Sequence, residues 1–212
     1  MKSDNQNNNK IGARRASAFS QIERVQPVKM LLYLCLAGIG VMFLILMAAY
    51  GRTEALRLEK LQIPFPKFFS VSTLLLFGSS LTIARVPKLY AKDKLRKMCR
   101  YLGFTLALSL LFIVSQLLGW YELAESGVYF RGRPFGSYLY LITGLHVLHV
   151  TAGLLFLMYL YFRSLYVSRD AIRTLIYIRD PFRKMQLSMV ATYWHFLGGL
   201  WLALYLFFLF MV

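Results

Sequence analysis

Five stretches of the chain contain no Asp, Glu, Lys or Arg, and they constrain the fold more than any other feature. They comprise residues 30–50, 68–84, 101–121, 134–162 and 185–212. Most of them reach the roughly 20 residues that a helix needs to cross about 30 Å of hydrocarbon. The second is the shortest, but Lys67 and Arg85 at its ends can extend their charged groups into the headgroup region. The pattern predicts five transmembrane helices.

The overall composition agrees with this interpretation. The 212 residues are 58% hydrophobic and only 16% charged, which a soluble domain of this size could hardly bury in one core. In lipid every backbone polar group must be satisfied within the chain, so runs without strand alternation imply helices. We therefore expect an all-α, polytopic five-helix bundle over residues 29–212. Its spans are predicted at about 30–50, 68–84, 101–121, 136–162 and 187–211, after a flexible, polar and basic tail at residues 1–28.

The distribution of basic residues predicts the orientation. The chain has 25 Lys and Arg residues and a net charge of +16. Nineteen of these residues lie in 1–29, 85–100 and 163–184, which fall on one side of the membrane, and six lie on the other side. The positive-inside rule then places the N-terminus in the cytoplasm and the C-terminus outside. This one-sided charge favours a membrane over nucleic acid as the chain's surroundings. We expect the location to be a bacterial inner membrane.

Polar residues inside the spans are the candidate functional residues, because each is costly in lipid unless it has a partner. In the fourth span Thr143, His146 and His149 share one face. In the fifth, Ser188, Thr192, His195, Gly198 and Gly199 share another. Gln116 lies in the third span. We expect these faces, and with them all three histidines, to point into the bundle.

Three histidines within a bundle raise the hypothesis of a haem or metal site. His146 and His195 have comparable predicted depths, as a bis-histidine haem requires, and His146 and His149 are about one turn apart. The alternative is that the imidazoles form hydrogen bonds between helices or contact lipid. The spans contain no carboxylate, which disfavours a proton channel, and there is no nucleophile–base pair or phosphate loop that indicates catalysis by the chain itself.

Two motifs resemble subunit III of the haem-copper terminal oxidases, the cytochrome c oxidase family. The segment Tyr140–Val150, YLITGLHVLHV, is similar to the family's (F/Y)xxTGxHxxHV signature. The segment Ala191–Phe196, ATYWHF, followed by Trp201, is similar to its YWHF stretch and downstream tryptophan. The resemblance spans about residues 29–212 and corresponds to a short, five-helix form. The family's topology, with N-terminus inside and C-terminus outside, agrees with the charge distribution.

The resemblance implies an accessory subunit of a cytochrome c or quinol oxidase that reduces oxygen to water with proton translocation. Such a subunit carries no haem or copper, packs against catalytic subunit I and other oxidase subunits, stabilises subunit I during turnover and binds phospholipid. Membership of a respiratory supercomplex is compatible with this role. The implied helix-packing or lipid contacts are Gln116, Thr143, His146, His149, Tyr193, Trp194 and His195, and no catalytic, cofactor or metal residue is implied.

Three positions depart from the family pattern. Gly40, Gly119 and Gly198 stand where many members have a buried carboxylate. A proton role that depends on carboxylates is therefore not implied for this chain. Two alternative functions stay open on the sequence alone. One is a haem-binding membrane anchor that uses His146, His149 and His195, and the other is a lipid or ion carrier.

Overall fold

The computed structural model describes residues 27–55, 66–130, 134–170, 174–175, 177 and 179–211. Its main helices are α2 (Pro27–Ala55), α3 (Lys67–Ile83), α4 (Val86–Ala91), α5 (Leu95–Glu125), α6 (Pro134–Val167) and α8 (Pro181–Met211). The predicted N-terminal tail lies outside the described residues, apart from its last two, which belong to α2.

Five helical segments of the described chain are long and apolar enough to cross a membrane, which confirms the predicted all-α membrane fold. They extend beyond the charge-free stretches, since charged side chains at the ends of the spans can reach the headgroup region. The second span includes both α3 and α4. Pro87, in the first turn of α4, lacks an amide hydrogen and disfavours helix in the residue before it, so the span is interrupted after α3.

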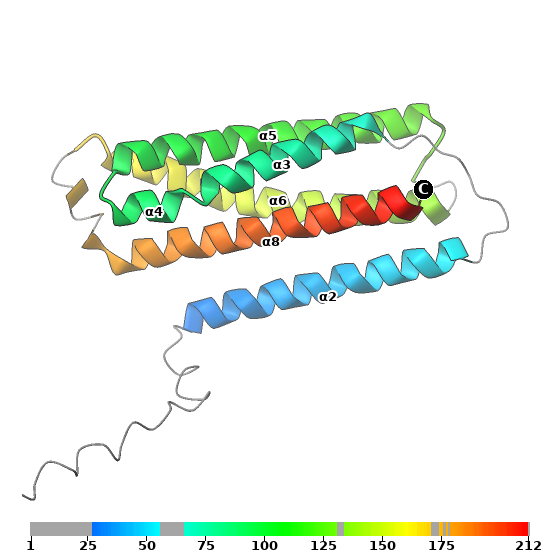
Figure 1. Cartoon of the computed structure of the whole chain (residues 1–212), viewed down its shortest axis with the longest axis horizontal. Helices are drawn as coiled ribbons and strands as arrows, with labels where there is room; N and C mark the ends of the chain where they lie inside the picture. Colours follow the sequence, from blue (N-terminus) through cyan, green and yellow to red (C-terminus); the bar gives the residue numbers. More distant parts are fainter. Residues whose placement is uncertain are drawn as a thin grey trace, which may run out of the picture.

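The helices form an elongated bundle in which consecutive spans run in opposite directions (Figure 1). The most extensive contacts join α3 to α5, and α6 and α8 complete the interior. Among the described helices α2 packs mainly against α6 and α8, and an apolar cleft of about 380 Å³ separates part of it from these two helices. The start of α2 and the C-terminus lie at opposite ends of the bundle (Figure 1).

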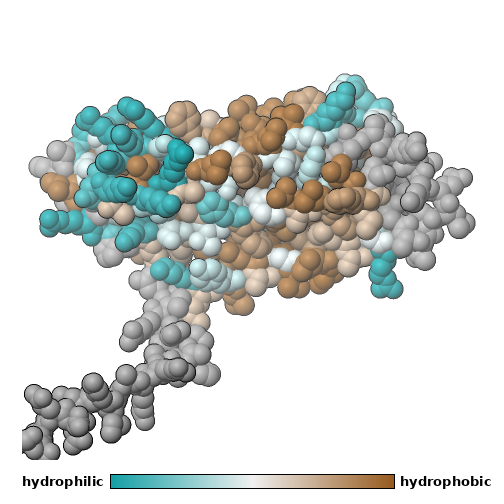
Figure 2. Space-filling view, in the orientation of Figure 1, coloured by the Kyte–Doolittle hydropathy of each residue, from teal (hydrophilic) through white to brown (hydrophobic). Residues whose placement is uncertain are grey.

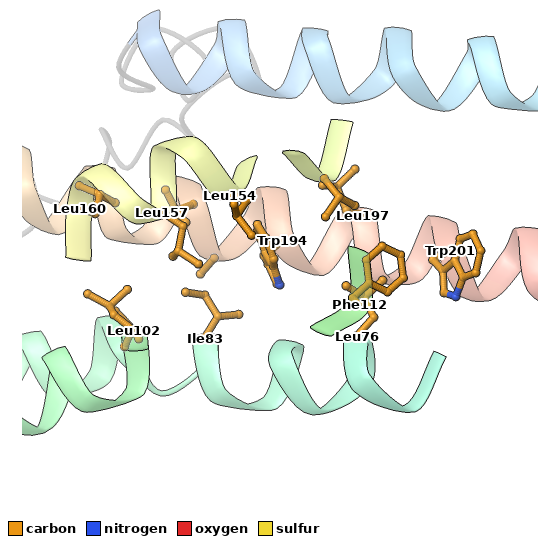
Figure 3. Packing of buried hydrophobic residues seen from close by; sticks show 14 of the residues in the cluster. Leu76, Ile83, Leu102, Phe112, Leu154, Leu157, Leu160, Trp194, Leu197 and Trp201 are labelled. Atoms are coloured by element: carbon orange, nitrogen blue, oxygen red, sulfur yellow. The ribbon is translucent and has the colours of Figure 1, made fainter. Parts of the chain in front are cut away.

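Large apolar side chains fill the interior of the bundle. Helix α8 contributes residues spaced three or four apart, as one helical face requires. They are Trp194, Leu197, Trp201, Leu204 and Phe208, each at most 1% exposed. Figure 3 shows several of them meeting Leu76 and Ile83 of α3 and Leu157 of α6. Because lipid tails are as apolar as these side chains, close packing rather than transfer out of water holds the helices together.

The basic loops meet at one end of the bundle, which is formed by α4, the start of α5, the end of α6 and the start of α8. Figure 2 shows this end as a hydrophilic cluster beside a mainly apolar belt. Tyr90 ties the end together, because its hydroxyl lies 2.6 Å from the carbonyl oxygen of Tyr177 and 2.9 Å from that of Asp180. Burial raises the pKa of the Tyr177 phenol, whose oxygen lies 3.0 Å from Ser164 Oγ.

Candidate functional site: polar seams between the helices

His146 lies at the centre of the bundle and is fully buried. Its ring centroid lies 5.0 Å from that of Trp201, 5.9 Å from that of Phe112 and 6.3 Å from that of Phe43. Neither ring nitrogen has a hydrogen-bond partner among the described residues. The surroundings of His146 are therefore those of an aromatic packing residue.

Gln116 and Thr143 join α5 to its two neighbours. Gln116 Nε2 donates to Ser72 Oγ of α3 at 2.7 Å. Trp120 Nε1 donates to Thr143 Oγ1 of α6 at 3.0 Å. These are side-chain hydrogen bonds between helices, the kind of contact predicted for the polar residues of the spans.

His149 and Tyr193 lie where α6 approaches α8. The Tyr193 hydroxyl donates to the backbone carbonyl oxygen of His149 at 2.9 Å. His149 Nδ1 lies 2.7 Å from the carbonyl oxygen of Leu145 in its own helix. A Cβ atom at Gly153 would lie only 2.7 Å from the Tyr193 ring. The absence of a side chain at this position therefore leaves the space that the ring occupies.

Helices α3 and α8 are joined by a series of side-chain hydrogen bonds that we call the α3–α8 seam. From one end to the other, the pairs are Ser70–Tyr205 at 2.9 Å, Thr73–Trp201 at 3.0 Å, Ser79–Trp194 at 3.0 Å and Ser80–His195 at 2.6 Å. Sequence reasoning singled out Trp194 and His195 but missed Ser70, Thr73 and Tyr205. The signal for Ser70 and Thr73 was the repeated occurrence of hydroxyl residues along the second span, whereas nothing in the sequence singled out Tyr205.

The expectation that all three histidines point into the bundle is wrong for His195. His195 is exposed on the outer surface of α8, together with Ser188 and Gly199. The reason is steric, because Trp194, Trp201 and the other large side chains of α8 occupy the opposite, inward side. The face of α8 that carries the small and polar residues therefore lies on the outside of the bundle.

This arrangement does not assemble a histidine site. His146 is enclosed by aromatic rings, whereas His195 lies on the surface and pairs with Ser80. In the part of the chain that the structure describes, no group of three His, Cys, Asp or Glu side chains converges as a metal site. A bis-histidine haem shared by His146 and His195 therefore lacks the required geometry.

The chain matches one known protein family over most of its length. The family model described as cytochrome c oxidase subunit III matches residues 55–212. The chain belongs to this family. Within the subunit III fold, the two motifs found in the sequence lie on α6 and α8, and they meet through the Tyr193–His149 hydrogen bond.

Individual relatives carry the same description. The chain is 30% identical over 133 residues to a probable cytochrome c oxidase subunit 3 of Mycobacterium leprae, covering 63% of this chain and 61% of the relative. It is 32% identical over 142 residues to a probable subunit 3 of Rickettsia prowazekii, covering 66% and 46%. A subunit 3 of Thermostichus vulcanus is 27% identical over 136 residues, covering 64% and 62%. The alignments thus span about three fifths or less of these relatives.

The three glycines that depart from the subunit III pattern have different surroundings. A Cβ atom at Gly119 would lie 2.5 Å from the buried Phe69 ring, so Phe69 fills the space that a side chain at this position would need. At Gly40 the nearest side-chain atom, in Phe196, would lie 3.7 Å away. At Gly198 an added Cβ would meet nothing within 4 Å.

Proposed function

We propose that this chain is an accessory, non-redox subunit of a respiratory haem-copper oxidase. In this role it packs against the catalytic subunit, stabilises it and binds lipid, while partner subunits hold the haem and copper and carry out oxygen reduction with proton translocation. The observation that carries the proposal, beside the family match, is the polar face that α8 presents to the outside of the bundle. We propose that a transmembrane helix of another oxidase subunit docks on this face.

The depth of His195 supports a protein partner rather than lipid headgroups. Helix α8 has 31 residues, and His195 lies about 21 Å from its start and about 24 Å from its end. A membrane-spanning α8 therefore holds the imidazole near the middle of the hydrocarbon, beyond the reach of headgroups. His195 Nδ1 already pairs with Ser80 of α3, and lipid tails offer no hydrogen bond to the second ring nitrogen, so a neighbouring helix is the surrounding that can satisfy it.

The outward sides of other helices provide the contrast. The exposed side chains in the middle of α5 and α6 are apolar, and they include Phe104, Leu110, Leu111, Val114, Leu117, Leu148, Leu155 and Phe156. These surfaces suit lipid. In the view of Figure 2, by comparison, pale residues interrupt the apolar belt on the side of α3 and α8.

The glycines of α8 also support the proposal that its outward face is the docking surface. An added Cβ atom would meet nothing within 4 Å at Gly198 or Gly199. The packing of the described chain therefore does not require glycine at either position, although glycine inside a helix is less favourable than alanine. Small residues on the surface of a membrane helix allow a partner helix to approach closely. They complement the hydrogen-bonding groups of His195 and Ser80 beside them.

Affinity purification of the tagged chain in mild detergent tests the proposal. We expect a haem-copper catalytic subunit to co-purify, identified by mass spectrometry and by its haem spectrum. Purification of the chain alone, or with unrelated proteins, would contradict its assignment to an oxidase complex. Stoichiometric haem in the isolated chain would instead support the membrane-anchor alternative.

Substitutions on the α8 face test the docking surface separately. We expect Gly199→Leu and His195→Leu to reduce the co-purifying catalytic subunit at least tenfold, because one blocks close approach and the other removes the polar group. Ala48→Leu, on the exposed side of α2, is the matched control and should retain the partner. Thermal unfolding of each isolated variant checks that the bundle is intact. Normal co-purification of both α8 variants would exclude this face as the docking surface.

A further inference from the structure

The hydroxyl groups of α3 do not all direct their hydrogen to the same kind of acceptor. Thr73 donates to the carbonyl oxygen of Phe69 at 2.8 Å. Ser79 donates to that of Leu76 at 2.7 Å. Because a hydroxyl has only one hydrogen, Thr73 and Ser79 can only accept in the α3–α8 seam, and the indole N–H groups of α8 are the matching donors.

Ser80 differs from both of them. Its hydroxyl has one hydrogen-bond partner among the described residues, Nδ1 of His195 at 2.6 Å, and this partner is not a backbone carbonyl. The hydroxyl hydrogen is therefore directed at Nδ1, which accepts it. A charged ring is costly at the depth of His195, and a neutral ring carries its proton on the nitrogen that does not accept. The proton of His195 is therefore on Nε2, which makes this nitrogen a donor.

His149 is the opposite case within the same protein. Its Nδ1 lies 2.7 Å from the carbonyl oxygen of Leu145. A carbonyl oxygen can only accept, so Nδ1 of His149 carries the proton. The neutral rings of His149 and His195 therefore hold different tautomers, each selected by the group that faces Nδ1.

The exposed face of α8 also limits what can meet Nε2 of His195, which has no partner within the described chain. Gly199 lies on this face one turn further along, about 6 Å from His195. A glycine there lets a neighbouring backbone come close, so a short side chain suffices to reach Nε2. Serine and threonine are short, and they accept an N–H while donating to their own helix, as Thr73 and Ser79 do.

We infer that the partner helix on this face places a serine or threonine hydroxyl opposite His195, and that this hydroxyl accepts a hydrogen bond from Nε2. Ser80 is a positioning residue, because its hydroxyl selects the tautomer in which Nε2 is a donor. The inference rests on the proposed function for the presence of a partner helix. It adds which side chain that helix carries and at what depth.

The tautomer is tested on the isolated full-length chain, with isotope-labelled histidine and solid-state NMR in lipid under mildly alkaline conditions. We expect the signals of His195, assigned by their loss in His195→Gln, to show the proton on Nε2, and those of His149 to show it on Nδ1. Ser80→Ala should move the His195 population toward the Nδ1 tautomer, whereas the matched control Ser79→Ala should not. A protonated Nδ1 at His195 in the unaltered chain would overturn the inference.

Co-purification of the catalytic subunit tests the donor role in the complex. His195→Leu should reduce it at least tenfold. His195→Gln, whose amide N–H can take the place of Nε2, should restore it to within about threefold of the unaltered chain. Equal losses in the two variants would overturn the donor role, although the docking face itself would remain supported.

Photocrosslinking identifies the partner side chain. A diazirine amino acid at Leu202, which is 46% exposed and lies about two turns after His195, should link in the intact complex to a transmembrane helix that carries a serine or threonine. Alanine in place of that residue should weaken co-purification as much as His195→Leu does, with no further loss when the two changes are combined.

The remaining outcomes separate the inference from the proposed function. A linked helix without such a hydroxyl would overturn the inference and leave the docking face in place. Links to lipid alone, or the absence of other oxidase subunits from every sample, would overturn the proposed function and the partner helix with it. The NMR result on the isolated chain decides the tautomer in either case.

Discussion

At the scale of single residues, the tightest surroundings of any described glycine are those of Gly119. The Phe69 ring packs directly on its Cα, and Phe69 is only 1% exposed. Neither residue can move far, because α3 and α5 form the most extensive helix pair of the bundle. Gly119 therefore sets how closely these two helices approach.

We expect Gly119→Ala to destabilise the protein by about 1–3 kcal/mol, since the new methyl group would force the Phe69 ring and the backbone apart. Unfolding in detergent, followed by circular dichroism, measures the effect. Gly38→Ala on the exposed side of α2 is the control, and it should not lower stability because an added Cβ there meets nothing within 4 Å. Equal stability of the two variants would contradict the close packing at Gly119.

His146 and Gln116 make opposite predictions, although both are buried polar residues. His146 has no hydrogen-bond partner for its ring, so His146→Leu should leave stability unchanged or raise it by about 1 kcal/mol. Gln116→Leu removes the hydrogen bond to Ser72 and should lower stability by about 1 kcal/mol. The same unfolding measurement compares them. Strong destabilisation by His146→Leu would show that the imidazole has a polar role in the interior.

At the scale of the helices, the α3–α8 seam explains how two helices of similar hydropathy find a fixed register. Its four hydrogen bonds repeat along both helices, and each joins a hydroxyl group of α3 to an aromatic side chain of α8. A shift by one helical turn would separate every pair. In an apolar solvent, dispersion contacts alone would allow the two helices several registers, so such hydrogen bonds select one of them.

We expect a double-mutant cycle of Ser79→Ala and Trp194→Phe to give a coupling energy of about 0.6 kcal/mol, with about 1.7 kcal/mol as the upper bound. A cycle of Ser79→Ala with Thr151→Ala is the control. Among the described residues Thr151 bonds to the Val147 carbonyl of its own helix, so this coupling should lie within about 0.5 kcal/mol of zero. A Ser79–Trp194 coupling no larger than the control would mean that the bond does not fix the register.

At the scale of the whole molecule, the five spans of the described chain and one strongly basic end give the bundle a polarity. Lys88 of α4, Lys92 just after it, Arg100 near the start of α5, Arg163 near the end of α6 and Lys184 near the start of α8 lie at the same end. The opposite end carries Glu122 and Glu125 at the end of α5. The positive-inside rule predicts that the basic end faces the cytoplasm.

We expect a cysteine at Ser126 to react with a membrane-impermeant maleimide in intact spheroplasts, and a cysteine at Lys92 to react only after permeabilisation. Both positions are exposed and lie at opposite ends of α5. The background carries Cys35→Ala and Cys99→Ala, so that each variant has one reactive thiol. The reverse labelling pattern would contradict the predicted orientation.

Much of this protein could be predicted from its sequence, and for local reasons. Whether a helix is long and apolar enough to span a membrane, and which loops carry Lys and Arg, depends on residues that are neighbours in the chain. The motifs around His146 and His195 also identified the subunit III family without knowledge of the fold. The contacts of Gln116 with Ser72 and of Trp120 with Thr143 could be anticipated only as a type, because their partners lie on other helices.

The orientation of each helix about its own axis is what the tertiary structure decided. In a membrane both the interior and the surroundings are apolar, so hydropathy does not say which side of α8 faces inward. The sequence led us to place the polar side of His195 inside, but the volume of Trp194 and Trp201 fills the space between the helices and turns His195 outward. The sequence by itself determined five spanning helices, because that depends on length and hydrophobicity. Their contacts and exposed faces depend on how side-chain volumes from distant segments fit together.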